Sequence, residues 1–319
     1  MSRESAPGTV ELKEPTKSVL RNAVQWLAQY GETILDAPDC GAGPLILFGL
    51  NYGLRPLQGS ERPTGVSEIL RRLTDHIASQ WALQARELHN NFLSGGFVSP
   101  MLAAAVLPVS SGAAKQLLEI CSDEWRMAEA SNAFAASPTL LWTGRRLLAN
   151  MGDTTPELRS RTWWSSEVSM LPFKYRIPPS AIRQMVADVA AMSAYGRFQP
   201  PMPNPERDYL QDTLPFLTFY YLKEQDLDMV NPLLRALRYT RMTEIPEYPQ
   251  AIEFVLRRSR ADGSFSMRDM ASHLQSASDS AAINVRRDVH LPLTVASIWA
   301  LVDCVFPESA LGSEFCESA

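Results

Sequence analysis

The sequence predicts an all-α fold, and two patterns carry that prediction. Apolar residues recur at helical spacing over long stretches, whereas the alternation of apolar and polar residues that is typical of strands is nearly absent. Strongly apolar helices also alternate with amphipathic ones along the chain. Such alternation is typical of an inner and an outer layer, so we expect an α/α toroid or an incomplete α/α barrel. An irregular helical bundle is the alternative.

The amphipathic helices are expected where apolar residues form a single stripe. The first stripe joins Val19, Ala23, Trp26, Leu27 and Tyr30 at helical spacing. Further stripes predict helices within residues 69–88, 117–130, 182–192, 231–241 and 252–256. The helices expected within 117–130 and 231–241 lie between strongly apolar ones, and we place such amphipathic helices in the outer layer.

The apolar helices are expected to begin at prolines. Proline is favoured at the first helical position because its fixed φ suits the helix and its missing N–H would have no partner there. Apolar segments start in this way at Pro44, Pro138, Pro215, Pro249 and Pro292. We therefore expect these prolines to mark the starts of the inner helices, with all the starts gathered at one end of the ring.

The sequence predicts one folded domain between two flexible ends. Both ends of the chain are polar, over residues 1–16 and 307–319, and are expected to be flexible. A chain of 319 residues is long enough for one large domain or two small ones. No stretch between the two ends has the composition of a linker, so residues 17–306 are expected to form a single helical domain.

Composition argues against several classes of partner. Acidic residues outnumber basic ones by 35 to 30, giving a net charge of −5, whereas nucleic-acid-binding proteins present basic surfaces. No apolar stretch approaches the length that a bilayer requires, and the first residues lack the apolar core of a secretory signal. The four cysteines form no Cys-x-x-Cys pair, as is typical of reduced thiols. We therefore expect a cytoplasmic protein with no nucleic-acid partner and no membrane partner.

A short pattern near the C-terminal end of the expected domain carries a resemblance. Phe254 lies near the end of an amphipathic helix, Gly263 supplies a helix stop that permits a positive φ, and Phe265 follows two residues later. The pattern resembles one repeat of the α/α toroids of terpene cyclases and prenyltransferases, although Ser259 stands where those repeats have glutamine. The resemblance implies the toroid fold and bears little on chemistry.

The next segment resembles the following inner helix of such toroids, because Asp288 and His290 come directly before an apolar run that begins at Pro292. The catalytic signatures of these families are missing, since the sequence contains neither Asp-x-Asp-Asp nor Asp-Asp-x-x-Asp. The zinc site of protein prenyltransferases needs an Asp, a Cys and a His, and no cysteine lies between Cys121 and Cys304 to complete it with His290. We therefore expect no metal and no other cofactor.

Asp288 and His290 are the candidate catalytic pair. We expect an extended backbone at His290 because Pro292 follows closely, and Asp288 is near enough in sequence to orient the imidazole ring. A histidine oriented by an aspartate is suited to moving protons. If the inner helices start at one end of the ring, both residues lie at an acidic mouth. Carboxylates also occur before helices simply because they stabilise the positive end of the helix dipole.

Aromatic residues on the expected inner helices are candidates for substrate contact. These are Trp142, Phe216, Tyr220 and Trp299, and Asp212 would lie near the mouth beside them. Aromatic walls with a few polar groups are typical of small-molecule sites. Aromatic residues at helical spacing also serve as ordinary core, which is the alternative for all four.

These patterns lead to two functional hypotheses. The first is a protein of bacterial specialised metabolism that binds an apolar or isoprenoid-like small molecule in a central cavity, with acid–base chemistry at the acidic mouth. Whether it is an enzyme stays open at this point. The second is a non-catalytic helical-repeat scaffold for a protein or peptide. Trp163 and Trp164, in the least helical stretch, are the candidate contact for such a partner or for a second copy of the chain.

Overall fold

The computed structural model describes residues 9–35, 42–83, 173–267 and 289–310, apart from positions 194, 197, 198 and 201, together with Glu119. Eight α-helices and two short 3-10 turns form the regular structure of these residues, and they contain no strand. Extended pairing within them is limited to an isolated antiparallel bridge between Ser259 and Phe265. The prediction of an all-α fold is therefore confirmed over the described ranges.

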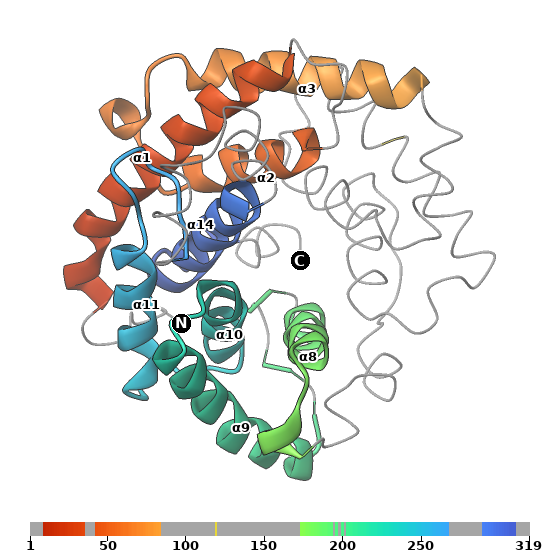
Figure 1. Cartoon of the computed structure of the whole chain (residues 1–319), viewed down its shortest axis with the longest axis vertical. Helices are drawn as coiled ribbons and strands as arrows, with labels where there is room; N and C mark the ends of the chain where they lie inside the picture. Colours follow the sequence, from red (N-terminus) through yellow and green to blue (C-terminus); the bar gives the residue numbers. More distant parts are fainter. Residues whose placement is uncertain are drawn as a thin grey trace, which may run out of the picture.

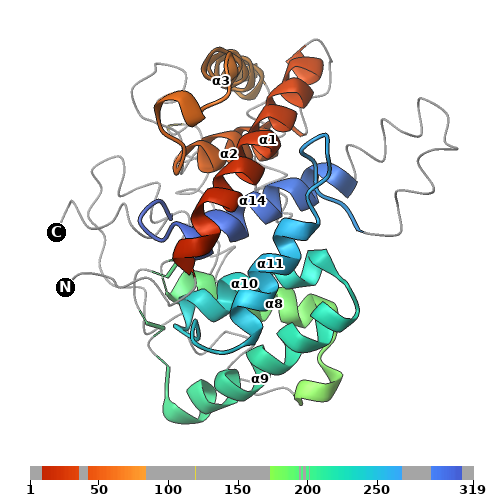
Figure 2. The same ribbon diagram turned by 90° about the vertical axis from the view of Figure 1, so that its left-hand side faces the viewer.

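The α-helices are α1 (Thr9–Leu35), α2 (Gly43–Leu54), α3 (Val66–Leu83), α8 (Pro179–Met192), α9 (Asn204–Lys223), α10 (Leu227–Tyr239), α11 (Glu247–Arg257) and α14 (Leu291–Val305). They pack in two layers (Figure 1). In the inner layer α2 contacts α14, α14 contacts α10, and α10 contacts α8. In the outer layer α3, α1, α11 and α9 cover these helices (Figures 1 and 2).

The two layers alternate along the chain. The outer helix α1 leads into the inner helix α2, α9 leads into α10, and α11 precedes α14. The last of these pairs lies beside the first, because α14 packs against both α1 and α2. Contact between the first and last described helices therefore closes the arrangement on that side.

Helix α2 is almost wholly buried between α1 and α14. Gly49 and Gly53 make this close packing possible, since a Cβ atom on Gly49 would lie 2.7 Å from Leu27 Cδ1, and one on Gly53 would lie 2.6 Å from Val24 Cγ2. The other side of Gly49 faces Val295 of α14, at 2.9 Å from the same Cβ position. Two glycines one turn apart thus let α1 and α14 approach the α2 backbone.

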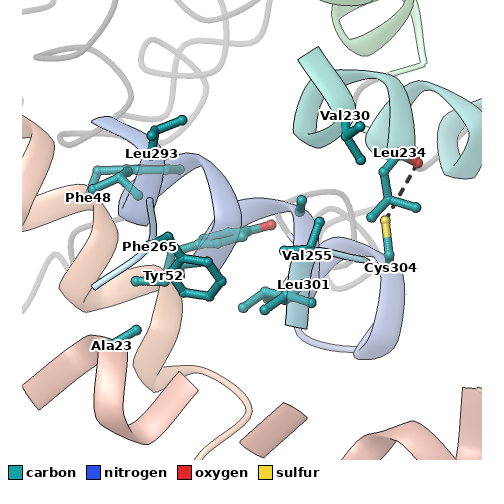
Figure 3. Packing of buried hydrophobic residues seen from close by; sticks show 14 of the residues in the cluster. Ala23, Phe48, Tyr52, Val230, Leu234, Val255, Phe265, Leu293, Leu301 and Cys304 are labelled. Carbon is teal, nitrogen blue, oxygen red and sulfur yellow. Dashed lines mark hydrogen bonds between the residues drawn. The ribbon is translucent and has the colours of Figure 1, made fainter. Parts of the chain in front are cut away.

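The main core fills the space between the layers (Figure 3). Phe48 of α2 lies beside Leu293 of α14 there, and α10 contributes Val230 and Leu234 from the other side. The Sγ atom of Cys304 donates a hydrogen bond of 3.6 Å to the carbonyl oxygen of Leu234. Burial raises the pKa of Cys304 to about 12, so this thiol is a neutral part of the core.

The proline rule for helix starts holds at some positions and is wrong at another. Pro44 and Pro292 lie in the first two residues of α2 and α14, as expected. Pro249 is the third residue of α11, which begins at Glu247 and lies in the outer layer, so the prediction of an inner helix at Pro249 is wrong. Pro215 lies inside α9, whose early proline is Pro205 instead. The apolar run after Pro215 therefore continues a helix that had already begun, and it belongs to the outer layer.

Two other boundaries differ from the sequence expectation. Helix α1 begins at Thr9, so residues 9–16 of the expected N-terminal tail are helical, and Thr16 is fully buried. The helix predicted within 231–241 is α10, and it lies in the inner layer although its sequence is amphipathic. The helix predicted within 117–130 and the inner helix predicted after Pro138 lie outside the described residues, apart from Glu119.

No helix in the described ranges combines the length and the apolar character needed to cross a membrane.

The turn after α11 forms at the residues that carry the family resemblance. Gly263 has φ +91°, the left-handed conformation that glycine alone adopts without strain. A Cβ atom at this position would lie 2.3 Å from the backbone oxygen of Asn22 in α1, so the turn rests directly on the first helix. Phe265 folds back into the core and is fully buried. This turn therefore joins α11 to α1.

Candidate functional site

The inner helices present one common face that carries aromatic and charged residues. On α14, Pro292, Ala296, Trp299 and Asp303 recur every three or four residues and so share one side of the helix. Ala296 and Trp299 are half-buried and Pro292 is exposed, whereas the residues between them are buried against neighbouring helices. We call the side chains that gather here the inner-face cluster, which consists of Phe48, Tyr52, Tyr195, Arg235, Tyr239, Trp299 and Asp303.

Asp303 is the buried acid of the inner-face cluster, with only 1% of its surface exposed. The hydroxyl of Tyr52 on α2 donates a hydrogen bond to its Oδ1 atom, and the hydroxyl of Tyr239 on α10 donates to its Oδ2 atom. The carboxyl group thus ties three inner helices together. A buried acid with both oxygens occupied meets the requirement that buried polar groups find partners.

Opposing effects act on the protonation of Asp303. Burial raises its pKa, because a charged carboxylate is poorly solvated there. Hydrogen bonds from Tyr239 and Tyr52 act in the opposite direction, as do the positive charges of Arg235 and Arg238, but the pKa stays above the usual aspartate range. Burial likewise raises the pKa of Tyr239 well above its ordinary value, so its hydroxyl remains a donor.

Trp299 lies at the centre of the aromatic contacts. Its ring centroid is 4.9 Å from that of Phe48 in an edge-on arrangement and 5.7 Å from that of Tyr195. The ring of Tyr52 lies edge-on at 6.4 Å. These spacings are those of favourable aromatic pairs. Trp299 remains half-buried, so this aromatic wall is not wholly covered.

Tyr195 joins the cluster through an unusual backbone conformation just after α8. Its φ angle is +54°, which is uncommon for a residue with a side chain, and its N–H donates to the carbonyl of Ala190 at 2.8 Å. Gly196 follows with φ +83°, and a Cβ atom there would lie 2.7 Å from the ring of Tyr239. The strained turn therefore places Tyr195 between Trp299 and Tyr239.

Arg235 is the cation of the inner-face cluster. Its guanidinium carbon lies 3.8 Å from the centre of the Trp299 ring, in cation–π contact, and the side chain is half-buried. Its Nε atom is buried and finds no hydrogen-bond partner among the described residues, and the same holds for Nε1 of Trp299. Both of these atoms can only donate hydrogen bonds. The cluster thus contains buried donors without acceptors.

Trp299 is the one predicted contact residue that the structure places in the cluster. Phe216, Tyr220 and Asp212 lie on the outer helix α9, which packs against α10 and α11. Tyr220 is 46% exposed and Asp212 is exposed. The expectation that these three residues line an inner wall is wrong, because it treated Pro215 as the start of an inner helix.

Trp142 and Asp288, together with Trp163 and Trp164, lie outside the described residues.

His290 has a different setting from the one expected. Its backbone is helical, with φ −71° and ψ −37°, because the turn that becomes α14 has already begun there. The side chain is buried, and its Nδ1 atom lies 3.3 Å from Oγ of Ser264. Ser264 Oγ donates to Oδ1 of Asp262 at 2.7 Å. His290 is therefore part of the contact between α14 and the turn after α11.

A second hydrogen bond chain fixes the same turn. Thr294 accepts from the backbone N–H of Phe265 at 3.0 Å and donates to the backbone oxygen of His290 at 2.7 Å. Burial alone would raise the pKa of Asp262, but the bonds from Ser264 and the charge of Arg260 hold it below its usual range. We call these residues the turn cluster: Asp262, Gly263, Ser264, Phe265, His290 and Thr294.

Among the described residues, no group of three or more histidine, cysteine, aspartate or glutamate side chains is arranged to hold a metal ion.

Sequence reasoning missed Asp303, Tyr52, Tyr239 and Arg235. Asp303 carried a signal, because it is the one charged residue within the apolar run from Leu291 to Val305. A lone acid on such a helix has to find buried partners. Nothing in the sequence indicated those partners, since Tyr52 lies 251 positions away.

No known protein family matches the chain, and neither the curated proteins nor the solved structures include a match.

Proposed function

We propose that the chain is an α/α toroid. The alternation of outer and inner helices along the chain supports this architecture, as does the packing of α14 beside α1 and α2. In a ring of helical hairpins the last hairpin returns to the first, whereas an open solenoid keeps its two ends apart. The inner helices then surround a central space, and the inner-face cluster lies on the wall of that space.

The proposed function is the binding of a small, mostly apolar molecule against this wall. The observation that carries the proposal is the position of Trp299: it is half-buried, and aromatic residues from α2 and from the turn after α8 meet around it. Sites for small molecules combine such apolar walls with a few polar groups. Arg235 and the tyrosine-bound Asp303 are the polar groups here.

The cluster also supplies the group best suited to acid–base chemistry within such a site. Asp288 and His290 were the candidates from the sequence, but His290 is buried in the turn cluster. Burial raises the pKa of Asp303, and the hydroxyls of Tyr52 and Tyr239 link this acid to α2 and α10. Proton transfer at Asp303 is therefore the form of catalysis that we propose for this site, if its ligand is a substrate.

Binding can be tested by a thermal-shift screen of the purified chain against naphthalene derivatives, medium-chain alcohols and isoprenoid alcohols. A ligand of the native state at about a hundred times its dissociation constant should add about 2.7 kcal/mol of stability. We expect one of these classes to raise the melting temperature, and the variant Trp299→Leu to weaken that binding. The matched control is Tyr220→Leu on the outer helix, which should bind normally. Equal binding by all three proteins would contradict the proposal.

A second function is favoured by a separate observation. Four large aromatic side chains are exposed: Phe219 and Tyr220 on α9, and Phe173 and Tyr175 at the 3-10 turn Lys174–Arg176. The ring of Tyr175 also contacts Phe216 of α9, at 5.0 Å. Exposed patches of this kind mark contact surfaces. Light scattering of the wild type and of Tyr175→Ser/Tyr220→Ser would show whether this patch joins two copies of the chain.

A further inference from the structure

We propose that the ligand of the inner-face cluster carries a carboxylate group, and that Arg235 binds this group. The inference rests on the proposed function, because it assumes that a small molecule occupies the inner face. It goes beyond that function by assigning the polar end of the ligand. Three features of the cluster lead to it.

The first feature is the unused hydrogen-bonding capacity of Arg235. Its guanidinium carbon lies over the Trp299 ring, 3.8 Å from the ring centre, and this contact with the ring face uses none of the N–H groups as hydrogen-bond donors. Within the described part of the chain, Arg235 forms neither an ion pair nor a hydrogen bond. Arginine presents its N–H groups as a rigid fork, and this fork fits the two oxygens of a carboxylate.

The second feature is that Asp303 is nearby but is already engaged. Its negative charge interacts with Arg235, yet its two oxygens accept hydrogen bonds from Tyr52 and Tyr239. Within the described residues no ion pair joins Asp303 to Arg235, and the hydrogen-bond donors to Asp303 are the two tyrosines. A half-buried cation beside an acid that is bonded elsewhere remains available to an anion from outside.

The third feature is the pair of buried donors that lack acceptors, Nε of Arg235 and Nε1 of Trp299. Buried donors without partners are rare in native proteins, and where they occur they can mark the place at which a ligand group or an ion binds. A ligand group with anionic oxygens, bound beside Arg235 and Trp299, would supply acceptors for these two N–H donors.

Charge favours a carboxylate over a phosphate. Arg235 and Arg238 both act on Asp303, so with Asp303 ionised the local balance is one net positive charge. A carboxylate neutralises that charge, whereas a phosphate monoester with nearly two negative charges would leave an excess next to Asp303. The ligand that fits is an acid with an apolar or aromatic body, its body against Trp299 and its carboxylate on Arg235.

The test compares probes that share one aromatic body. Isothermal titration would measure the binding of 1-naphthylacetic acid, its neutral amide 1-naphthylacetamide, and 1-naphthyl phosphate. We expect the acid to bind the wild type at least about tenfold more tightly than the amide, as a charged hydrogen-bonded pair provides. In Arg235→Gln this preference should disappear, so that the acid and the amide bind with equal affinity. Arg235→Lys keeps the charge without the fork and should retain part of the preference.

The outcomes separate this inference from the proposed function. Equal binding of acid and amide by the wild type would overturn the carboxylate inference and leave the apolar site standing. Tighter binding of the phosphate than of the acid would also overturn it. Failure of all three probes to bind would overturn the proposed function as well. If Arg235→Gln does not fold, the salt dependence of binding by the wild type tests the inference. Added salt should weaken binding of the acid and leave binding of the amide unchanged.

Discussion

The inner-face cluster and the turn cluster both bury polar groups beside α14, but they differ in the partners of those groups, which belong to one turn and the start of α14 in the turn cluster and to three inner helices in the inner-face cluster. In the turn cluster the hydroxyl of Ser264 donates a hydrogen bond to Asp262. The hydroxyl of Thr294 donates to the backbone oxygen of His290 and accepts from the backbone N–H of Phe265. In the inner-face cluster Asp303 is fully engaged, while Nε of Arg235 and Nε1 of Trp299 are not. The two regions lie on the same helix, near its first turn and near its last turns.

This difference separates two uses of buried polarity. A network in which the groups bond one another fixes one arrangement of the chain, as the turn cluster does where it joins α11 and α14. A network with donors left over is incomplete by itself and gains stability from a partner that supplies acceptors. Variants of the turn cluster should therefore change stability, whereas variants of Arg235 and Trp299 should change binding.

The largest effect on stability is expected for Gly263→Ala in the turn cluster. The new Cβ atom would lie 2.3 Å from the backbone oxygen of Asn22, and φ is +91°. The loss should reach about 3 kcal/mol or more, because both backbone strain and a backbone clash have to be relieved. The matched control is Gly65→Ala, where φ is +82° but nothing lies within 4 Å. Urea unfolding should show a loss of only about 1 kcal/mol there.

If Gly263→Ala and Gly65→Ala lose the same stability, the contact between this turn and α1 does not contribute as described.

The next effect is expected at the two tyrosines that bind Asp303. Tyr52→Phe and Tyr239→Phe each remove one donor from a buried carboxyl group and should cost about 1–3 kcal/mol. The double variant should deviate from the sum of the single losses, because both hydroxyls bind the same acid. Tyr248→Phe is the control, since its hydroxyl donates to a neutral backbone oxygen at 3.1 Å. Unfolding in urea that is unaffected by both single variants would contradict the description of Asp303.

The pH dependence of stability gives a smaller and more specific effect. Burial raises the pKa of Asp303 in the folded chain, so on a rise in pH the unfolded chain releases this proton first. The stability that protonated Asp303 contributes is fully present below the pKa that Asp303 has in the unfolded chain. This stability is lost as the pH rises through the pKa that Asp303 has in the folded chain. Each unit of difference corresponds to about 1.4 kcal/mol. Asp303→Asn should abolish this part of the slope.

The measurement is the unfolding free energy of the wild type and of Asp303→Asn from pH 4 to pH 8. As the pH rises, the unfolding free energy of the wild type should fall relative to that of Asp303→Asn. A constant difference over that range would show that the pKa of Asp303 is the same in the folded and unfolded chains.

The smallest effect is expected on the outer helix. Asp212→Asn and Tyr220→Ser alter exposed side chains of α9 and should change stability by no more than about 0.5 kcal/mol. Binding of naphthylacetic acid should also stay unchanged. A loss of binding in either variant would place α9 at the ligand site and would remove the contrast between the inner face and the outer layer.

The fold could be predicted as far as local signals reach. Pro44 and Pro292 marked true helix starts because an N-terminal proline costs no hydrogen bond. Gly263 marked a true turn because its φ requires glycine. The prediction of a helix start at Pro215 was wrong, because a proline inside a long helix has the same sequence signature as a proline at the start of a helix. Which amphipathic helix is inner, as α10 is, depends on what its polar side faces, and periodicity does not encode that.

The site was less predictable because its bonds are non-local. Trp299 was found since a large aromatic on an apolar helix is a visible feature. The residues that contact its ring are Phe48, Tyr195 and Arg235, each on a different segment, and their sequence positions do not indicate these contacts. Tyr195 reaches the cluster only through a left-handed backbone conformation, for which its sequence position gives no signal. His290 was predicted as a catalytic residue because imidazole can transfer protons. In the structure its side chain is buried and contacts Ser264.

The bond between Tyr52 and Asp303 also has a consequence for how the chain is made. The two residues are 251 positions apart, so at about 5–20 residues per second a ribosome needs roughly 12–50 s to produce the second after the first. Throughout that interval α2, the helix with almost every residue destined for burial, has α1 beside it but no α14. The nascent protein therefore carries an uncovered apolar surface for most of its synthesis. Cellular factors that bind such surfaces have their longest opportunity at this helix.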